Sequence, residues 1–365
     1  METPILIDRR KFLAGAASLV AALPGIAQSA TTDTDIIFAS GCKFSDGTFG
    51  AVLLNEQYEI VHSVPTSIRG HDLAFRPGTD EIVIFARRPG NLAFVADTHA
   101  RTAPRIFTAS PDRHFYGHGE FSSDGRLLYV SENDFDNALG KIGIYDATAD
   151  YEKIGEFDSY GTGPHEVLMM PDGHTLAICN GGIETHPDFG RTKMNIESMK
   201  PSLVFMDSRS GDLLERHEAP PSLSQLSIRH MAITGRDTIY FGGQFEGNET
   251  RIVPLIGKCV RGEQIEFLDL GREIFAEFKQ YTGSVTATSD GDFIAVSSPR
   301  GKLIATISTS SDALVARHQL SDGCGLASMD NKIVVTSGEG AIGTLGDHQF
   351  LDIAFDNHLV ARKQT

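Results

Sequence analysis

The sequence has no long apolar run after residue 30, and it is poor in basic residues and in cysteine. Without a stretch of roughly 20 apolar residues, the chain beyond residue 30 offers no segment that spans a bilayer. Its 32 Lys and Arg against 48 Asp and Glu give a formal net charge of −16 at pH 7. This charge disfavours nucleic acid and anionic membrane surfaces as partners, because both are bound through excess basic side chains. A metal ion or another cationic partner is more compatible with it.

Several common chemical motifs are also missing. The four cysteines, Cys42, Cys179, Cys259 and Cys324, form no Cys-x-x-Cys or Cys-x-x-Cys-His pair, which argues against covalent haem attachment and a zinc knuckle. They allow three disulfide pairings, and buried free thiols remain an alternative. The sequence has no Gly-x-Ser-x-Gly elbow, no His-Glu-x-x-His pair and no phosphate loop, so nucleophilic chemistry is poorly supported.

The first thirty residues carry an export signal. Arg9 and Arg10 precede Lys-Phe-Leu, a weakly hydrophobic run ends at Leu23, and a region of small residues follows. This pattern is typical of a twin-arginine signal peptide. We expect residues 1–30 to be the signal, with cleavage between Ala27 and Thr31, and residues 31–365 to form one domain. The mature protein is then expected in the periplasm, exported already folded.

A repeated unit dominates the rest of the chain. Four of the units have a histidine followed by an apolar strand, and several units then reach an Asp-Gly turn. His71, His118 and His165 follow one another at intervals of 47 residues, and Arg229-His230 continues the series. Ser284 begins a further unit without histidine. This spacing lies within the roughly 40 to 50 residues of a four-stranded propeller blade.

Short runs rich in β-branched and aromatic residues separate these positions, which predicts an all-β protein. About 335 mature residues at roughly 47 per blade predict a single seven-bladed β-propeller. Inner strands are expected near residues 71, 118, 165, 230, 284 and 324, with residues 35–65 supplying the seventh blade. We expect Phe350–Phe355 to pair near Asp35–Phe38 and close the ring.

The repeated histidines are candidate metal ligands. Inner strands of a propeller surround its axis, so His71, His118, His165 and His230 should converge there, joined by His186 from the long loop that begins at Gly181. Converging imidazoles suit a first-row transition metal, and iron or copper is the expected cofactor if there is one. Glu166 is expected to complete the coordination shell, and other nearby carboxylates are candidates for the same role. The alternative is that each histidine only fastens its own blade.

Six arginines occur at related positions and are candidate ligand-binding residues: Arg69, Arg87, Arg88, Arg191, Arg229 and Arg300. Around one channel mouth they would favour a small anionic ligand or an anionic metal chelate. The alternative for any one of them is an ion pair between blades.

The chain resembles the exported bacterial proteins of the domain-of-unknown-function family 1513 over roughly residues 35–360. The motifs that carry this resemblance are Arg69–His71, Ala86–Gly90, Phe115–Gly119, Gly163–Glu166, Asn180–Pro187, Gly190–Arg191, Met199–Leu203, Ser227–His230, Ser298–Gly301 and Cys324–Leu326. The resemblance implies a propeller in an iron-related periplasmic setting, with iron-uptake proteins as partners.

Three functions are open on the sequence alone. The first is binding of a transition metal or anionic metal chelate at a channel mouth rich in His and Arg, accessory to iron uptake. The second is a lactonase-like hydrolase that uses the same funnel. The third is a non-catalytic platform for protein interaction, which would need an exposed apolar patch.

Overall fold

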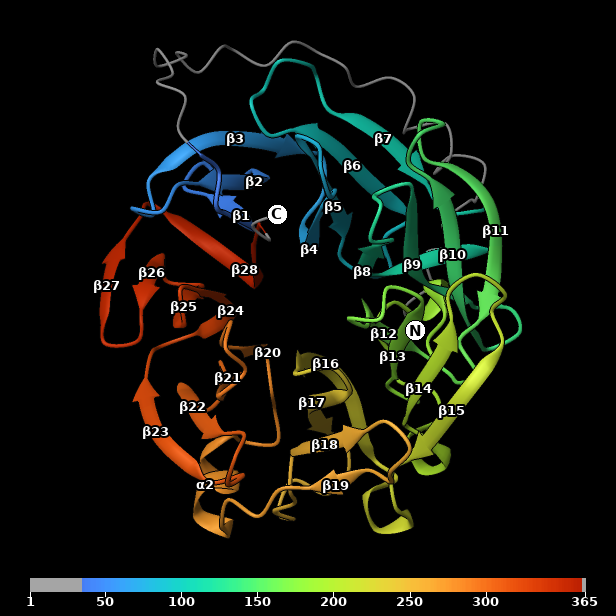
Figure 1. Ribbon diagram of the computed structural model, residues 1–365, viewed down its shortest axis with the longest axis vertical. Helices are drawn as coiled ribbons and strands as arrows, with labels where there is room; N and C mark the ends of the chain where they lie inside the picture. The colour runs from blue at the N-terminus through green and yellow to red at the C-terminus, as the bar shows by residue number, and fades with distance from the viewer. Residues whose placement is uncertain (1–34, 363–365) are drawn as a thin grey trace, which may run out of the picture. The chain divides into compact units, whose positions relative to one another are not determined.

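The computed structural model describes residues 35–362, which form one ring of seven antiparallel four-stranded sheets around a common axis (Figure 1). The fold is the seven-bladed β-propeller that the sequence predicts. Each blade runs outward from an inner strand next to the axis. The inner strands of the seven blades are β28, β4, β8, β12, β16, β20 and β24.

Each blade consists of four strands that follow one another from the axis to the outer edge of the ring. In this order, the first blade has β28 (Ile353–Ala361), β1 (Phe38–Phe44), β2 (Phe49–Leu54) and β3 (Ile60–Thr66). The second has β4 (Gly70–Phe75), β5 (Glu81–Ala86), β6 (Leu92–Asp97) and β7 (Arg105–Thr108). The third has β8 (Arg113–Phe121), β9 (Leu127–Asp134), β10 (Leu139–Asp146) and β11 (Glu152–Asp158). The fourth has β12 (Pro164–Met169), β13 (Thr175–Asn180), β14 (Ser202–Asp207) and β15 (Leu213–Glu218).

The fifth blade has β16 (Leu226–Thr234), β17 (Thr238–Phe245), β18 (Ile256–Val260) and β19 (Glu266–Phe267). The sixth has β20 (Ser284–Ala287), β21 (Phe293–Ser298), β22 (Leu303–Ser308) and β23 (Leu314–Gln319). The seventh has β24 (Gly323–Met329), β25 (Lys332–Ser337), β26 (Ala341–Thr344) and β27 (Asp347–Phe350). Short helices occur in the loops: α2 (Arg272–Glu277), η1 (Pro187–Phe189), η2 (Ile196–Ser198) and η3 (Pro221–Leu223).

The Asp-Gly pairs of the repeated unit form the turn between the inner and second strands. In the fourth blade, Gly173 has φ of 74°, a conformation that glycine adopts without a steric penalty. The Asp172 carboxylate accepts a hydrogen bond from the backbone N–H of Thr175 at 2.8 Å, which fixes the turn. Gly125 and Gly291 have φ of 67° and 76° at the matching positions of two other blades.

The ring closes by pairing of the two ends of the described chain. β28 lies antiparallel to β1, with Phe38 opposite Ala361 and Phe44 opposite Ile353. The sequence prediction placed the closing strand at Phe350–Phe355. This position is wrong, because the strand that pairs with β1 runs from Ile353 to Ala361. Phe350 instead ends β27, where it is 64% exposed, and the apolar residues that follow Ile353 build the buried inner strand.

The hydrophobic core is divided among the blade interfaces. The buried apolar residues form seven clusters, and each cluster draws on two neighbouring blades. One of them joins Phe38 and Val52 of the first blade to Val334 and Ile342 of the seventh. Every blade is therefore covered on both faces, and the closed ring leaves no apolar sheet face unpaired.

One face of the ring collects the loops that matter for the site. Because each blade is an antiparallel meander, the residues just before an inner strand and the loop between the second and third strands lie at the same end of the blade. We call this end the mouth face. It carries the turn between β5 and β6, the long loop at residues 181–201 between β13 and β14, and the turn between β21 and β22. Within residues 35–362, no helix has the length and apolar character needed to cross a membrane.

Candidate functional site

Five inner strands bring five histidines together at the axis: His358 on β28, His71 on β4, His118 on β8, His165 on β12 and His230 on β16. All five are buried, with exposed fractions of 1–8%. His118 lies in the middle of the group. Its ring centroid is 4.8 Å from His71, 4.7 Å from His165, 5.4 Å from His230 and 4.8 Å from His358. The sequence predicted that four histidines converge on the axis, and the structure brings these four together: His71, His118, His165 and His230.

Local breaks in strand pairing accompany these histidines. The register between the inner and second strands shifts between Gly70 and Leu73, between Phe115 and Gly119, and between Pro164 and Glu166. Similar shifts occur in β16 beside His230 and in the pairing of β28 with β1. A bulge of this kind twists the strand and redirects a side chain. The inner strand β20 pairs without a shift and has no histidine.

Several imidazole nitrogens in this cluster have no hydrogen-bond partner. They are His71 Nδ1, His118 Nε2, His230 Nδ1 and His358 Nε2, all buried. Unsatisfied buried polar atoms are costly, so four of them at one place call for an explanation such as an ion. Among the described residues, donor atoms of His71, His118 and His358 lie within 4.8 Å of one another, and so do those of His118, His165 and His230. Both groups include His118.

Carboxylates lie next to the histidines. His118 Nδ1 is 2.9 Å from Asp72 Oδ2, so the Nδ1–H group donates to the carboxylate and the Nε2 lone pair is left for a ligand. Glu166 accepts a hydrogen bond from the backbone N–H of Met231. Asp72, His118 and Glu166 form a third group of donors within 4.8 Å. The prediction from sequence included Glu166 and omitted Asp72.

Burial favours the neutral form of four of the five imidazoles. It is the main cause that lowers the pKa of His71, His165 and His230 well below the ordinary value, and the neighbouring histidines lower it further. Burial also lowers the pKa of His358 to about 4. Burial and then the charge of Asp72 raise the pKa of Glu166 well above its ordinary value. Neutral imidazole is the form that binds a metal ion, so these side chains fit a transition metal.

The arginines divide into paired and unpaired groups. Arg69 and Arg87 form ion pairs with Asp356, and Arg229 lies 3.3 Å from Glu246 and 3.2 Å from Ser227 Oγ. The pairs of Arg69 and Arg87 join the second blade to Asp356 of the first, as the alternative of an ion pair between blades expects, whereas Arg229 and Glu246 belong to the same blade.

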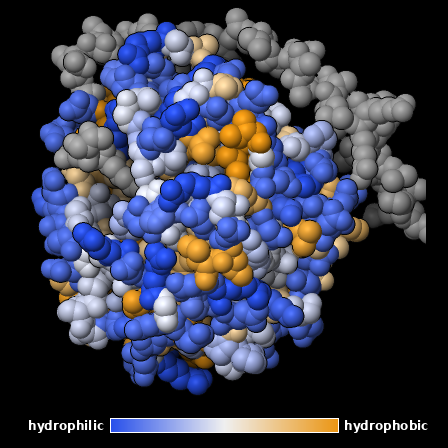
Figure 2. All heavy atoms as spheres, turned by 45° about the vertical axis from the view of Figure 1, so that its right-hand side comes forward, coloured by the Kyte–Doolittle hydropathy of each residue, from blue (hydrophilic) through white to orange (hydrophobic). Residues whose placement is uncertain are grey.

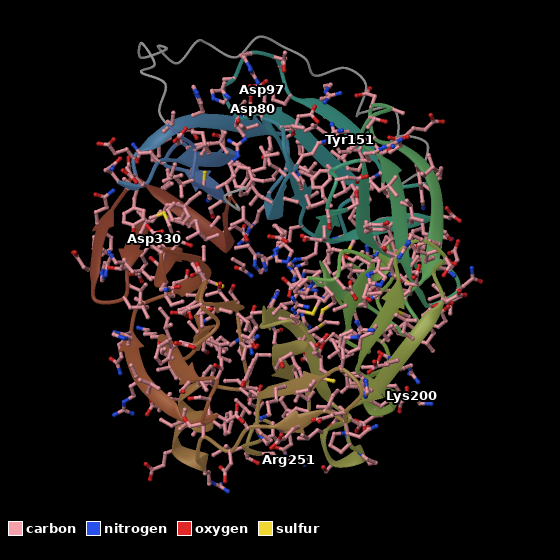
Figure 3. The ribbon with its side chains drawn as sticks, in the orientation of Figure 1. Asp80, Asp97, Tyr151, Lys200, Arg251 and Asp330 are labelled. Atoms are coloured by element: carbon pink, nitrogen blue, oxygen red, sulfur yellow. The ribbon has the colours of Figure 1, made fainter. Side chains whose placement is uncertain are left out.

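By contrast, the guanidinium groups of Arg88 and Arg191 have no hydrogen bond or ion pair to any described residue. Burial and then the charge of Arg229 lower the pKa of Arg88 to about 10. Burial, followed by the charges of Arg87 and Arg88, lowers the pKa of Arg191. Both side chains come from segments of the mouth face, Arg88 from the turn between β5 and β6 and Arg191 from the loop at residues 181–201. Figure 3 shows side-chain nitrogens gathered around the axis.

A small cavity connects the two sets of side chains. It has room for about one water molecule and is lined by Arg88, Tyr116, His165, Ser227 and Arg229, among others. Because arginines and a histidine line the same space, a ligand held at the mouth face would lie close to the histidine cluster.

Two predicted site residues lie outside the histidine cluster. His186 is in the long loop, where Nε2 is 3.5 Å from Asp136 Oδ1 and Nδ1 accepts a hydrogen bond from the Asp188 N–H at 3.2 Å. It belongs to none of the three donor groups. Arg300 stacks over the Tyr281 ring, with 4.4 Å from guanidinium carbon to ring centroid. The four cysteines are buried free thiols, and Cys324 lies at the bulge of β24 without joining a donor group.

The sequence interpretation missed His358 because it placed the closing strand too early in the chain. A partial signal was present, since His358 is the last histidine of the sequence and lies in the C-terminal apolar segment that here forms the inner strand β28. Asp72 was missed because neighbouring residues of a regular strand point to opposite faces. The bulge at Gly70–Leu73 removes that alternation.

No curated protein gives a significant match to the chain. Among solved structures, the hydrazine synthase of Kuenenia stuttgartiensis is similar, with a TM-score of 0.62 and 16% sequence identity, covering 86% of this chain and 96% of that one. At this identity the likeness shows the propeller fold alone. The family model described as a protein of unknown function (DUF1513) matches residues 64–362. The chain therefore belongs to the DUF1513 family.

Proposed function

We propose that this protein is a periplasmic metal-binding propeller, which holds a transition metal ion at the five-histidine cluster and an anionic ligand or metal chelate at the arginines of the mouth face. The observation that carries the proposal is that buried nitrogens of His71, His118, His230 and His358 have no hydrogen-bond partner; His71 Nδ1 lies 4.0 Å from Asp356 Oδ1. Iron or copper is the metal we expect, because imidazole suits both and the family resemblance favours iron. The protein serves iron uptake after export through the twin-arginine route.

Burial supports the metal site at the histidines, and positive charge supports the anion site at the arginines. The histidine cluster is buried, and burial favours the neutral form of His71 and His165, so these side chains contribute ligands without adding charge. Arg88 and Arg191 supply positive charge without a direct ion pair to any described residue, and a carboxylate or a chelate would accept bidentate hydrogen bonds from them. A metal delivered as an anionic chelate would satisfy both sets of side chains.

The interaction-platform alternative has less support. On the face shown in Figure 2 the surface is mainly hydrophilic, and apolar side chains form small separate patches. Exposed large apolar residues such as Ile106 and Ile154, each 57% exposed, occur on outer strands, where single exposed apolar residues are common. The lactonase alternative has less support, because the small cavity lined by His165, Arg88 and Arg229 has room for about one water molecule.

The first experiment is elemental analysis by mass spectrometry of the protein purified after native export. We expect about one iron or copper ion per chain, and at least a tenfold loss in the double variant His118→Ala/His165→Ala, because removal of several ligands abolishes coordination. His348→Ala, which removes an exposed histidine on β27, is the matched control and should keep its metal. A metal-free native protein, or equal metal content in the double variant, would refute the proposal.

The anion half is tested with ferric citrate as a chelate probe in a binding titration. Arg191→Glu should weaken binding about tenfold or more, because it replaces an attractive charge with a repulsive one at the mouth. Arg209→Glu makes the same change of charge in an exposed turn after β14 and should leave binding unchanged. Equal weakening in both variants would show an effect of net charge alone and would argue against an arginine site.

A further inference from the structure

A second cavity opens on the mouth face, away from the histidine cluster. It is a cleft of about 470 Å³ between the fifth and sixth blades. Its walls come from the loop between β17 and β18, from α2 with the residues that follow it, and from Arg300 in the turn between β21 and β22. Its volume falls in the range of roughly 300–1,000 Å³ that is usual for small-molecule sites. Figure 3 places Arg251, one of its lining residues, near the outer edge of the ring.

The base of the cleft is apolar. Val253, Leu255 and Phe275 line it and are 5%, 1% and 6% exposed. They belong to the apolar cluster that joins the fifth and sixth blades, so the base is part of the packed core. Ile252 and Ala276 extend this apolar lining toward solvent. Binding of a ligand with an apolar group would be favoured here, because apolar surface on both partners is removed from water.

The rim of the cleft is cationic. Arg251, Lys279 and Arg300 line it, with Glu249 as the one acidic residue of the lining. The ammonium group of Lys279 has no hydrogen bond or ion pair to any described residue, and the Arg300 guanidinium contacts the Tyr281 ring without an ion pair there. The chain as a whole has a formal net charge of −16, so the rim of the cleft differs in sign from the protein's overall charge. Such a local excess of positive charge favours an anion.

The walls are held in a fixed arrangement. Gln280 Nε2 donates to the backbone carbonyls of Asn248 and Arg251 at 3.0 and 2.9 Å, which ties the segment after α2 to the opposite loop. Arg251 donates to the Ser222 carbonyl at 2.6 Å. Lys279 and Gln280 have φ of 48° and 58°, a left-handed pair that persists only where surrounding contacts hold it. A preformed cleft binds a ligand without first having to order its own walls.

We propose that this cleft is a binding site for a small organic anion, namely a carboxylate or sulfonate attached to an aromatic or branched apolar group. The apolar group would pack against Ile252 and Ala276 above the buried base of the cleft, and the anionic group would reach Lys279 and Arg300. The site is separate from the three groups of metal-donor residues, so it does not depend on the metal proposal.

The test is isothermal titration calorimetry of the full mature protein in EDTA, with 2-naphthoate as the probe and the neutral 2-naphthamide as its partner. We expect 2-naphthoate to bind one to one and about tenfold more tightly than the amide, because a hydrogen bond to a charged group adds to the same apolar contact. Lys279→Glu should weaken binding of 2-naphthoate by tenfold or more. Ala276→Trp should weaken binding of both compounds by filling the cleft.

Lys332→Glu is the control, since it makes the same charge change at an exposed position on β25 of the seventh blade. It should leave both affinities unchanged, and thermal melting of each variant confirms that it is folded. The proposal is overturned if 2-naphthoate does not bind at millimolar concentration, if the amide binds equally well, or if either cleft variant keeps the native affinity. Loss of metal from the histidine variants has no bearing on these outcomes.

Discussion

His118 is the residue on which the whole cluster depends. It is 1% exposed, contacts each of the other four axial histidines and takes part in all three groups of possible metal donors. Its two nitrogens have different roles, since Nδ1 bonds to Asp72 and Nε2 has no partner. Asp72 thus acts as a positioning residue that fixes the tautomer of His118.

Gly117 holds another member of the cluster in place. It has φ of 103°, and a Cβ atom there would lie 2.7 Å from His71 Cδ2. We predict that Gly117→Ala lowers stability by about 1–3 kcal/mol through backbone strain, and also lowers metal affinity roughly tenfold or more because His71 must move. Denaturant unfolding and a metal titration measure the two effects.

Gly47→Ala is the control that separates the effect of backbone strain from the effect of the contact with His71. Gly47 also has a positive φ, 89°, but no atom lies within 4 Å of the Cβ position. This variant should lose a similar amount of stability and keep the native metal affinity. If both variants bind metal equally well, the position of His71 is not important for the site.

The inner strands show which elements the sequence could predict. The interval of 47 residues between His71, His118 and His165 placed three inner strands correctly, because the blades there have short loops of similar length. Ser284 and Cys324 marked two further inner strands at wider or narrower intervals. Spacing and apolar pattern were therefore sufficient to predict seven blades.

The parts of the site that escaped prediction depend on long-range pairing. His358 joins the cluster because β28 leaves the seventh blade and becomes the inner strand of the first, and the chain ends carry no repeat that would reveal this register. The pairing of Arg69 and Arg87 with Asp356 has the same origin, since Asp356 also lies on β28. By contrast, His186 lies in a loop outside the repeat, where neither spacing nor strand geometry determines its position.

At the scale of the whole molecule, burial of the axial imidazoles links the stability of the ring to pH. The folded-state pKa of His71, His165 and His230 lies well below the ordinary value, and that of His358 is about 4. In the unfolded chain each histidine returns to about 6.5. As the pH falls below about 6.5, the unfolded state binds protons that the folded state does not bind, so the free energy of unfolding decreases. Above about pH 6.5 this contribution does not change with pH.

We predict that the metal-free protein loses stability between about pH 7 and pH 5, by about 1.4 kcal/mol per pH unit below about 6.5 for each histidine that stays neutral when folded. Glu166 acts in the opposite direction, because its raised pKa lets the folded state bind a proton as the pH falls, so the net slope is that of the histidines less the contribution of Glu166. Most other carboxylates titrate below this window. Denaturant unfolding in EDTA at several pH values measures the slope. His358→Gln removes one such group and should give a shallower slope, because one buried imidazole fewer resists protonation. A stability that is constant over this pH range, or a slope that His358→Gln leaves unchanged, would mean that the axial histidines accept protons in the folded ring, and the cluster would then repel a cation in mildly acidic surroundings.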